Sequence, residues 1–176
     1  LMHNNFFKKY YFIDKFEKSK IDKQDTKTTI IYRNYKKNYD IGEIIFIKNY
    51  CKEKNIKFII SNNIRLSIQL NLDGAYLPSF NKNFDHLSYH FKKDFCLIGS
   101  AHNLKEIRIK EKQKVDKIFL SSIFKKNTNY LGLNKFNLIS KLTKKEVIAL
   151  GGVSPKNKKL IRLTKSAGFA GISIFN

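Results

Sequence analysis

Residues 147–155 read VIALGGVSP, an apolar run that ends in two glycines and a turn. A continuous apolar run is typical of a strand that is covered on both faces, as in a parallel sheet. Glycine directly after such a strand allows either tight packing or the close approach of an anion to the backbone, because it has no side chain. A segment with helical spacing begins at residue 156. The stretch therefore predicts a strand, a turn and a helix.

The same unit recurs along the whole chain. Eight apolar runs start at intervals of about 23 residues, and they are YYFI (10–13), TIIYR (29–33), KFIIS (57–61), GAYLP (74–78), FCLIGS (95–100), KIFLSS (117–122), EVIAL (146–150) and AGISI (170–174). Segments with helical spacing lie between them, at 41–55, 64–72, 103–113, 134–143 and 156–168. The repeat predicts an α/β fold, a (β/α)8 TIM barrel formed by residues 1–176 as one domain. An open doubly wound sheet is the alternative.

Two features predict a small barrel. The connection 14–28 is short and polar, so we expect a reduced first helix, and the sequence stops at Asn176, so we expect no closing C-terminal helix. Within 41–55, the spacing places Ile41, Ile44, Ile45 and Lys48 on one stripe, with Ile47 and Cys51 close by. Gly168 falls where a helix over 156–168 would have its C-cap.

The formal charge of +21 raises the question of a polyanionic partner. Only four of the 35 basic residues are Arg, and the lysines are spread along the whole chain. Arginine is preferred for bidentate contacts to bases and phosphates. We therefore interpret the charge as a compositional bias, predict no specific nucleic-acid partner, and keep a basic polyanion-binding barrel as an alternative.

The remaining composition predicts a protein of the cytoplasm. No apolar run approaches the roughly 18 residues that span a membrane, and we recognise no signal peptide. Cys51 and Cys96 lack metal-ligand spacing and lie in apolar runs, which predicts buried, inert thiols. His3, His86 and His90 follow no pattern and are predicted to lie on the surface.

The ordered motifs resemble those of the thiamine-phosphate synthase family, which also contains the TenI-like thiazole tautomerases. The resemblance extends from about residue 10 to residue 176 and is carried by YFID (11–14), Arg33, FIISNN (58–63), DGAYLP (73–78), IGSAHNLKE (98–106), LSSIF (120–124), VIALGG (147–152) and AGFAGISI (167–174). It implies a (β/α)8 barrel with a site at the C-terminal ends of the strands. The family reaction joins a thiazole phosphate to a pyrimidine methyl diphosphate, and it releases diphosphate with the help of Mg²⁺.

Several positions keep the implied phosphate and substrate contacts. Gly151 and Gly152 match the family's phosphate cup, and its second half is assigned to Phe175 and Asn176. Arg33 matches the Arg of a Gln-x-Arg-x-Lys segment that binds diphosphate, while its Lys position is Tyr35. An Arg inside a barrel is costly without an anion or carboxylate partner, which independently favours an anion site. A structural Arg whose charged end reaches solvent is the alternative.

Two more positions are implied as substrate contacts. Ser100 matches a ligand or pyrimidine contact, and Thr128 matches a Thr after the sixth strand. His102 is predicted to start a helix or to support the site rather than to act in catalysis. The tautomerases carry a His where this chain has Ser122, which cannot transfer protons as His does. No catalytic residue is assigned.

The positions that bind metal in the synthases differ in this chain. Their Asn-Asp-Asp segment is Ser61-Asn62-Asn63 here, and a second Asp aligns with Asn81. Mg²⁺ in diphosphate sites relies on carboxylates, so we predict no synthase-type metal site. Mg²⁺ would be a cofactor only if synthase activity is retained.

Three functions remain open from the sequence. The first is a thiamine-phosphate synthase-like transferase of thiamine biosynthesis or salvage that binds a thiazole phosphate. The second is a diverged relative that binds a heteroaromatic phosphate with tautomerase-like or no catalysis, and the third is the polyanion-binding barrel. The expected partner is a small-molecule phosphate rather than a membrane, and a homodimer is left open.

Overall fold

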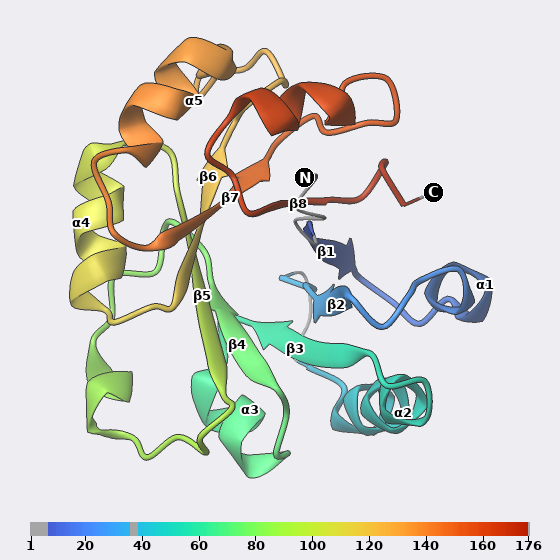
Figure 1. Ribbon diagram of the computed structural model, residues 1–176. Helices are drawn as coiled ribbons and strands as arrows, with labels where there is room; N and C mark the ends of the chain where they lie inside the picture. The colour runs from blue at the N-terminus through green and yellow to red at the C-terminus, as the bar shows by residue number, and fades with distance from the viewer. Residues whose placement is uncertain (1–6, 36–38, 176) are drawn as a thin grey trace.

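The computed structural model describes residues 7–35 and 39–175, and these form a closed parallel barrel (Figure 1). Each strand pairs with the next one along the chain, and the last pairs with the first. The predicted TIM barrel is therefore confirmed, and the open sheet is wrong. The strands are β1 (Lys8–Ile13), β2 (Thr28–Tyr32), β3 (Lys57–Ser61), β4 (Gly74–Leu77), β5 (Cys96–Ala101), β6 (Lys117–Ser121), β7 (Glu146–Leu150) and β8 (Gly168–Gly171).

Helices lie outside the barrel and follow most strands. They are α1 (Lys18–Asp22), α2 (Ile41–Glu53), α3 (Ile64–Gln69), the 3-10 helix η1 (Asp85–Ser88), α4 (Leu104–Lys112), α5 (Gly132–Ser140) and the 3-10 helix η2 (Lys158–Leu163). α1 has only five residues, which confirms the reduced first helix. Asp40, Asn63 and Asn103 accept a backbone N–H three residues on, and each so caps the start of a helix.

Large apolar and aromatic side chains fill the interior of the barrel. Every strand contributes to this cluster, which comprises Tyr10, Phe12, Ile31, Ile59, Tyr76, Ile98, Phe119, Ile148 and Ala170. The Phe12 and Tyr76 rings meet edge to face at 5.3 Å. Two further clusters pack the helices onto the outside of the strands. The interior is thus a packed core, and a site can form only where the strands end.

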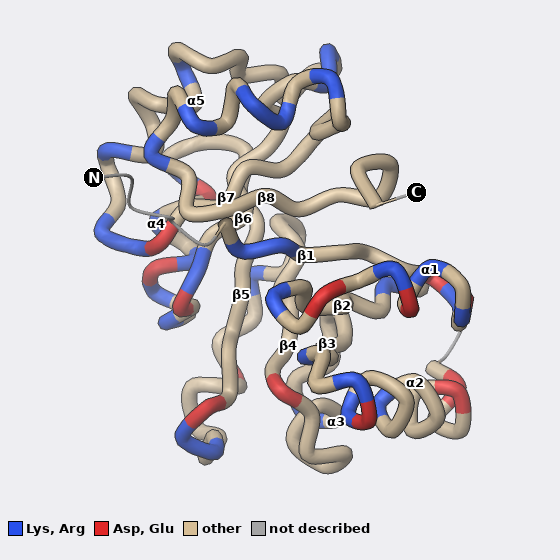
Figure 2. Tube along the Cα trace, turned by 45° about the vertical axis from the view of Figure 1, so that its right-hand side comes forward, with Lys and Arg blue, Asp and Glu red and all other residues tan. Residues whose placement is uncertain are grey.

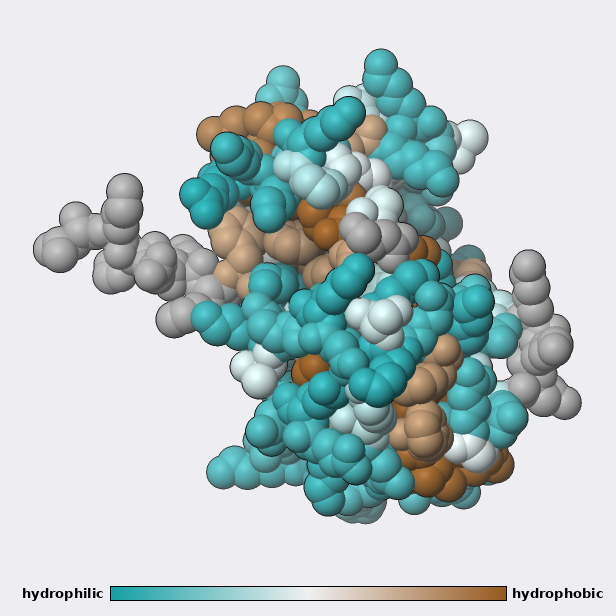
Figure 3. Space-filling view, turned by 90° about the vertical axis from the view of Figure 1, so that its right-hand side faces the viewer, coloured by the Kyte–Doolittle hydropathy of each residue, from teal (hydrophilic) through white to brown (hydrophobic). Residues whose placement is uncertain are grey.

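The face that α2 buries differs from the predicted stripe. Ile44, Ile47 and Cys51 are fully buried, whereas Ile41 and Ile45 are exposed. The helix carries apolar residues on most of its sides, so their spacing alone does not select the buried face. Packing against β2 and β3 selects it. Figure 3 views the side that carries α1 and α2, where hydrophobic patches lie between hydrophilic side chains.

The last strand begins and ends earlier than the sequence predicts. β8 is Gly168–Gly171 rather than 170–174, so Gly168 opens a strand and caps no helix. Gly168 lies opposite Lys8 in the pairing that closes the barrel. The preceding helix is a 3-10 helix with only Ile161 buried, because Leu160 and Leu163 face solvent. The expected absence of a closing helix after β8 stays a prediction.

The cysteines and histidines differ in their burial. Both cysteines are free; Cys51 is buried and Cys96 is half-buried, and burial raises the pKa of each thiol. The surface prediction is wrong for His86, which is buried with its Nε2 2.8 Å from the Gln113 carbonyl oxygen. His3 lies outside the described residues. Lys and Arg are distributed over most elements (Figure 2). No helix among the described residues has the length and apolarity needed to cross a bilayer.

Candidate functional site

A cavity of about 540 Å³ opens at the C-terminal ends of the strands. Four residues singled out from the sequence line it: Arg33, Ser100, Gly151 and Gly152. The other lining residues are Phe12, Tyr35, Tyr76, Pro78, Ser79, Phe80, His102, Ser121, Ser122, Lys125, Asn127, Leu150, Val153, Gly171, Ile172 and Ser173. We call this cavity the mouth. Its position matches the place where barrels of this kind carry their chemistry.

Arg33 provides a positive charge at the mouth. It directly follows β2, and its backbone N–H donates to the Ile13 carbonyl oxygen at 2.7 Å. Its guanidinium carbon lies 4.5 Å from the centre of the Phe12 ring, a cation–π contact. Within residues 7–35 and 39–175, no carboxylate forms an ion pair with it. The charge is therefore held by an aromatic face and is available to an anion.

The lining has a strong charge asymmetry. Lys125 is its second cation, and none of the described residues that line the mouth is acidic. A half-enclosed site with cations and no carboxylate favours an anionic ligand, because Coulomb attraction is less screened there than in bulk water.

The glycine pair after β7 has a packing role. Gly151 and Gly152 have φ angles of +98° and +77°, which side chains rarely adopt. A Cβ on Gly151 would lie 2.5 Å from the Ser122 Oγ, and a Cβ on Gly152 would lie 2.6 Å from the backbone nitrogen of Lys125. The Gly151 carbonyl accepts from the backbone N–H groups of Phe124 and Lys125 at 2.9 and 3.1 Å. The glycines thus let the loop after β6 pack directly on the end of β7.

Backbone donors remain around this turn. Among the described residues, the N–H groups of Gly152, Val153 and Ser173 have no protein acceptor. The Ser173 hydroxyl donates to the Val153 carbonyl at 3.4 Å, so the loops after β7 and β8 are joined here. Unpaired N–H groups on two adjacent loops are suited to binding the oxygens of a phosphate.

For the second half of the cup, the sequence predicts Phe175 and Asn176. Asn176 lies outside the described residues, and the ring of Phe175 packs 4.9 Å from that of Tyr11. Ile172 and Ser173 line the mouth instead. The signal was present, since an apolar residue followed by Ser occurs at 172–173, but placing the strand at 170–174 hid it.

Ser100 lies deep in the mouth, and Thr128 does not reach it. The buried Ser100 Oγ accepts a hydrogen bond of 2.9 Å from the Tyr76 hydroxyl. Burial holds the pKa of Tyr76 well above its ordinary value, so its phenol stays neutral. Thr128 is exposed and is absent from the lining, whereas Lys125 and Asn127 from the same loop are part of it.

His102 and Ser122 are held by neighbouring groups. The His102 Nδ1 lies 2.9 Å from a Glu106 Oε2 that also accepts the His102 backbone N–H at 2.8 Å. This contact orients the imidazole at the start of α4. The Ser122 hydroxyl donates to the Lys125 carbonyl at 2.8 Å.

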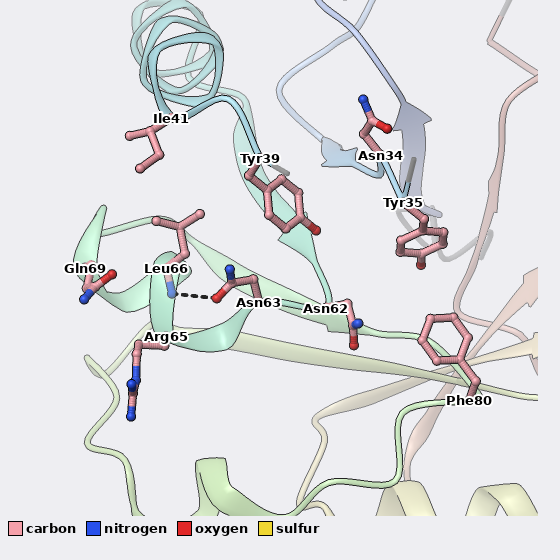
Figure 4. A pocket seen from close by; sticks show the side chains of 10 residues that line it. All are labelled: Asn34, Tyr35, Tyr39, Ile41, Asn62, Asn63, Arg65, Leu66, Gln69 and Phe80. Carbon is pink, nitrogen blue, oxygen red and sulfur yellow. Dashed lines mark hydrogen bonds between the residues drawn. The ribbon is translucent and has the colours of Figure 1, made fainter. Parts of the chain in front are cut away.

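A second cavity of about 730 Å³ adjoins the mouth above β2 and β3 (Figure 4). Tyr35 and Phe80 line both cavities, and their rings meet edge to face at 5.7 Å. The Tyr35 hydroxyl is hydrogen-bonded to the Ser61 Oγ at 2.7 Å, and burial raises its pKa. An aromatic pair thus stands between the two cavities, and one of its members, Tyr35, occupies the position where the resemblance implies a lysine.

The two asparagines at the metal positions contact each other. The Asn81 Nδ2 donates to the Asn62 Oδ1 at 2.6 Å. Asp73 accepts the Phe58 backbone N–H and does not join them. No group of three or more His, Cys, Asp or Glu side chains that could hold a metal occurs in the described part of the chain. These residues do not fit Mg²⁺, because that ion is bound in diphosphate sites by carboxylates and both positions carry amides. In addition, the Asn62 Oδ1 already accepts a hydrogen bond from the Asn81 amide.

Restoring both carboxylates should make stability depend on Mg²⁺. In EDTA, we expect the free energy of unfolding of the Asn62→Asp, Asn81→Asp double variant to be about 1 kcal/mol lower than that of the parent. The reason is that two like charges would replace an amide hydrogen bond. Added Mg²⁺ should recover this loss. Thermal unfolding with EDTA and with Mg²⁺ measures both effects, with Asn62→Asp alone as the control. A double variant that melts like the parent under both conditions would contradict the contact between the two side chains.

The chain is similar in sequence to known proteins. The family model described as thiamine monophosphate synthase matches residues 24–175. A thiamine-phosphate synthase of Coprothermobacter proteolyticus is 26% identical over 138 residues, which cover 73% of this chain and 63% of the relative. One of Persephonella marina is 29% identical over 141 residues, covering 74% and 65%. The chain thus spans slightly less than two thirds of the length of these curated relatives.

A solved structure has the same fold. Thiamine phosphate pyrophosphorylase from Pyrococcus furiosus superposes with a TM-score of 0.77 at 19% identity, covering 98% of this chain and 91% of that one. At that identity the likeness supports the fold.

Proposed function

The chain belongs to the thiamine monophosphate synthase family, and on that premise we propose that its mouth binds a thiazole phosphate. The observation that carries the proposal is the charge of the lining, which has Arg33 and Lys125 and no acidic residue among those described. A small anionic ligand is the chemical class that such a cavity attracts.

Each part of the mouth has a role in this proposal. The unpaired N–H groups of Gly152, Val153 and Ser173 would donate to the phosphate oxygens. The aromatic walls formed by Phe12 and Tyr76 would contact the heteroaromatic ring. A volume of about 540 Å³ accommodates one small molecule of this kind.

The transfer step is not part of the proposal. The resemblance implies Mg²⁺ for the release of diphosphate, and the Asn62–Asn81 amide contact does not fit that ion. A tautomerase-like role also lacks support, because Ser122 stands in place of a His and its hydroxyl is bonded to a carbonyl. We therefore propose a diverged relative that binds the thiazole phosphate.

Thiazole phosphate should stabilise the protein without Mg²⁺. At one hundred times Kd the expected gain is about 2.7 kcal/mol, which a thermal-shift titration detects. Arg33→Met should weaken binding roughly 10- to 100-fold, since a charge-assisted hydrogen bond contributes about 1.5–3 kcal/mol. Arg162→Met, at an exposed position away from the mouth, is the matched control and should bind like the parent.

Two outcomes would change the proposal. No stabilisation by thiazole phosphate would contradict it. Stabilisation by pyrimidine methyl diphosphate only when Mg²⁺ is present would contradict the restriction to binding and would favour the synthase activity for which the curated relatives are named.

Organisation and location stay predictions. We propose that residues 1–176 act as a single domain in the cytoplasm and have no specific nucleic-acid partner, because their basic side chains are spread over most elements (Figure 2). Sedimentation would distinguish a monomer from a homodimer, and nucleic-acid binding that persists at physiological salt would favour the polyanion-binding alternative.

A further inference from the structure

Lys110 of α4 is fully buried, which is rare for a lysine. Its Nζ donates to the carbonyl oxygens of Pro78 and Asn81 at 2.8 and 2.7 Å and to the Gln113 Oε1 at 2.9 Å. An ammonium group has three donors, so all of them are used. Two of the three acceptors belong to the loop that joins β4 to η1.

Gln113 holds the same loop from the end of α4. Its Nε2 donates to the carbonyl oxygens of Asn83 and Asn81 at 2.7 and 3.2 Å. The backbone carbonyl oxygen of Gln113 lies 2.8 Å from the Nε2 of His86, a buried residue just after the loop. Lys110 and Gln113 together, which we call the clamp, therefore contact the loop at Pro78, Asn81 and Asn83, and through His86 the helix that follows it.

The barrel leaves space for the lysine stem. Gly99 of β5 lies beneath it, and a Cβ at that position would be 2.7 Å from the Lys110 Cδ. This close approach requires glycine. Within the described part of the chain, the carboxylate that acts electrostatically on Lys110 is that of Glu106, one turn earlier on α4.

The clamped loop forms one wall of the site. Ser79 and Phe80 line the mouth, and Phe80 also lines the adjoining cavity. Asn81 continues the hydrogen-bond network to Asn62 at the end of β3. A continuous chain of hydrogen bonds thus runs from α4 through the loop to β3.

We propose that Lys110 and Gln113 are positioning residues that hold the β4–η1 loop and so set the wall of the mouth made by Ser79 and Phe80. Residues 78–84 form neither helix nor strand. The clamp supplies the order that regular secondary structure supplies elsewhere. The inference rests on the proposed function only for the effect on ligand affinity.

Hydrogen exchange of the loop tests the clamp directly. The amides of Asn81, Asn83 and Asp85 are hydrogen-bonded within the loop and serve as reporters. In Lys110→Met these amides should exchange at least roughly tenfold faster, while amides of β2 and β7 stay protected. Gly99→Ala, which keeps the ammonium group but displaces the stem, should give the same signature and also covers the case in which Lys110→Met does not fold.

A core variant separates positioning from loss of stability. Cys51→Ala removes a buried side chain of α2 away from the loop, and it should lower the melting temperature without changing exchange at the three reporters. Equal exchange at the reporters in Lys110→Met and Cys51→Ala would overturn the proposal.

Ligand affinity provides a second readout. Thiazole phosphate should bind roughly tenfold more weakly to Lys110→Met and unchanged to Cys51→Ala. If the parent binds no thiazole phosphate but the loop exchanges faster in Lys110→Met, the proposed function fails and the clamp stands. If the ligand binds equally to all variants, the role of the clamp in shaping the mouth is refuted.

Discussion

Gly168→Ala is expected to reduce the free energy of unfolding by about 3 kcal/mol or more. A Cβ at this position would lie 2.0 Å from the Lys8 carbonyl oxygen. That oxygen belongs to the backbone of β1, so no rotamer change can relieve the contact. The pair Lys8–Gly168 is where β8 meets β1, and moving these strands apart opens the barrel.

Urea denaturation followed by circular dichroism measures this loss. Gly42→Ala is the matched control, since Gly42 lies in α2 and a Cβ there would approach a side-chain atom, the capping Asp40 Oδ1 at 3.2 Å, rather than backbone. Alanine is favoured over glycine in helices, so the control should change stability by less than about 1 kcal/mol. A Gly168→Ala protein with the parent's unfolding midpoint would show that β1 and β8 are not this close.

Stability should rise with pH in the parent relative to Lys110→Met. Burial lowers the pKa of Lys110 from 10.5 to about 8 in the folded state, partly opposed by Glu106. Between these values the unfolded chain binds more protons than the folded one, so deprotonation favours folding. The cost of burying the charge is fully present below pH 8 and is removed as the pH rises to 10.5, a gain of about 3 kcal/mol.

The difference between the two proteins isolates this effect. Other groups lower the stability of both proteins at high pH. For example, burial raises the pKa of Tyr32 to about 12, so this tyrosine resists ionisation in the folded state. Those groups are the same in both proteins and cancel. Urea denaturation at pH 7, 8, 9 and 10 should give a parent-minus-variant difference that increases with pH. A constant difference would mean that Lys110 does not change its charge in this range.

The predicted strands show which parts of the fold depend on local sequence. Two strands have the predicted bounds, 57–61 and 146–150, because a continuous β-branched run bounded by polar residues is a local signal. β8 does not have the predicted bounds, because Gly168 at its start pairs with Lys8 of β1, which is 160 positions away in the chain. Because β8 ends at Gly171, Ser173 lies in the loop that lines the mouth, whereas the sequence analysis places it inside the strand.

The candidate site divides in the same way. Arg33, Ser100, Gly151 and Gly152 were predicted to come together, and they do, because the carboxyl ends of parallel strands meet at one end of a barrel. Their roles as ligand contacts stay predictions, as do those of Asn176 and of Thr128, which the structure places outside the lining.

The sequence by itself determined the class of fold, the number of strands and the end of the barrel where the polar residues gather. These follow from periodicity and from residues at strand ends, which are local properties of the chain. Only the tertiary structure decided which face of α2 is buried, that the glycines after β7 admit a neighbouring loop, and that Lys110 is captured by carbonyl groups of the β4–η1 loop. The physical reason is that these burials and hydrogen bonds form between segments that are distant in the chain. A local sequence pattern does not distinguish a lysine that becomes buried from one that stays exposed.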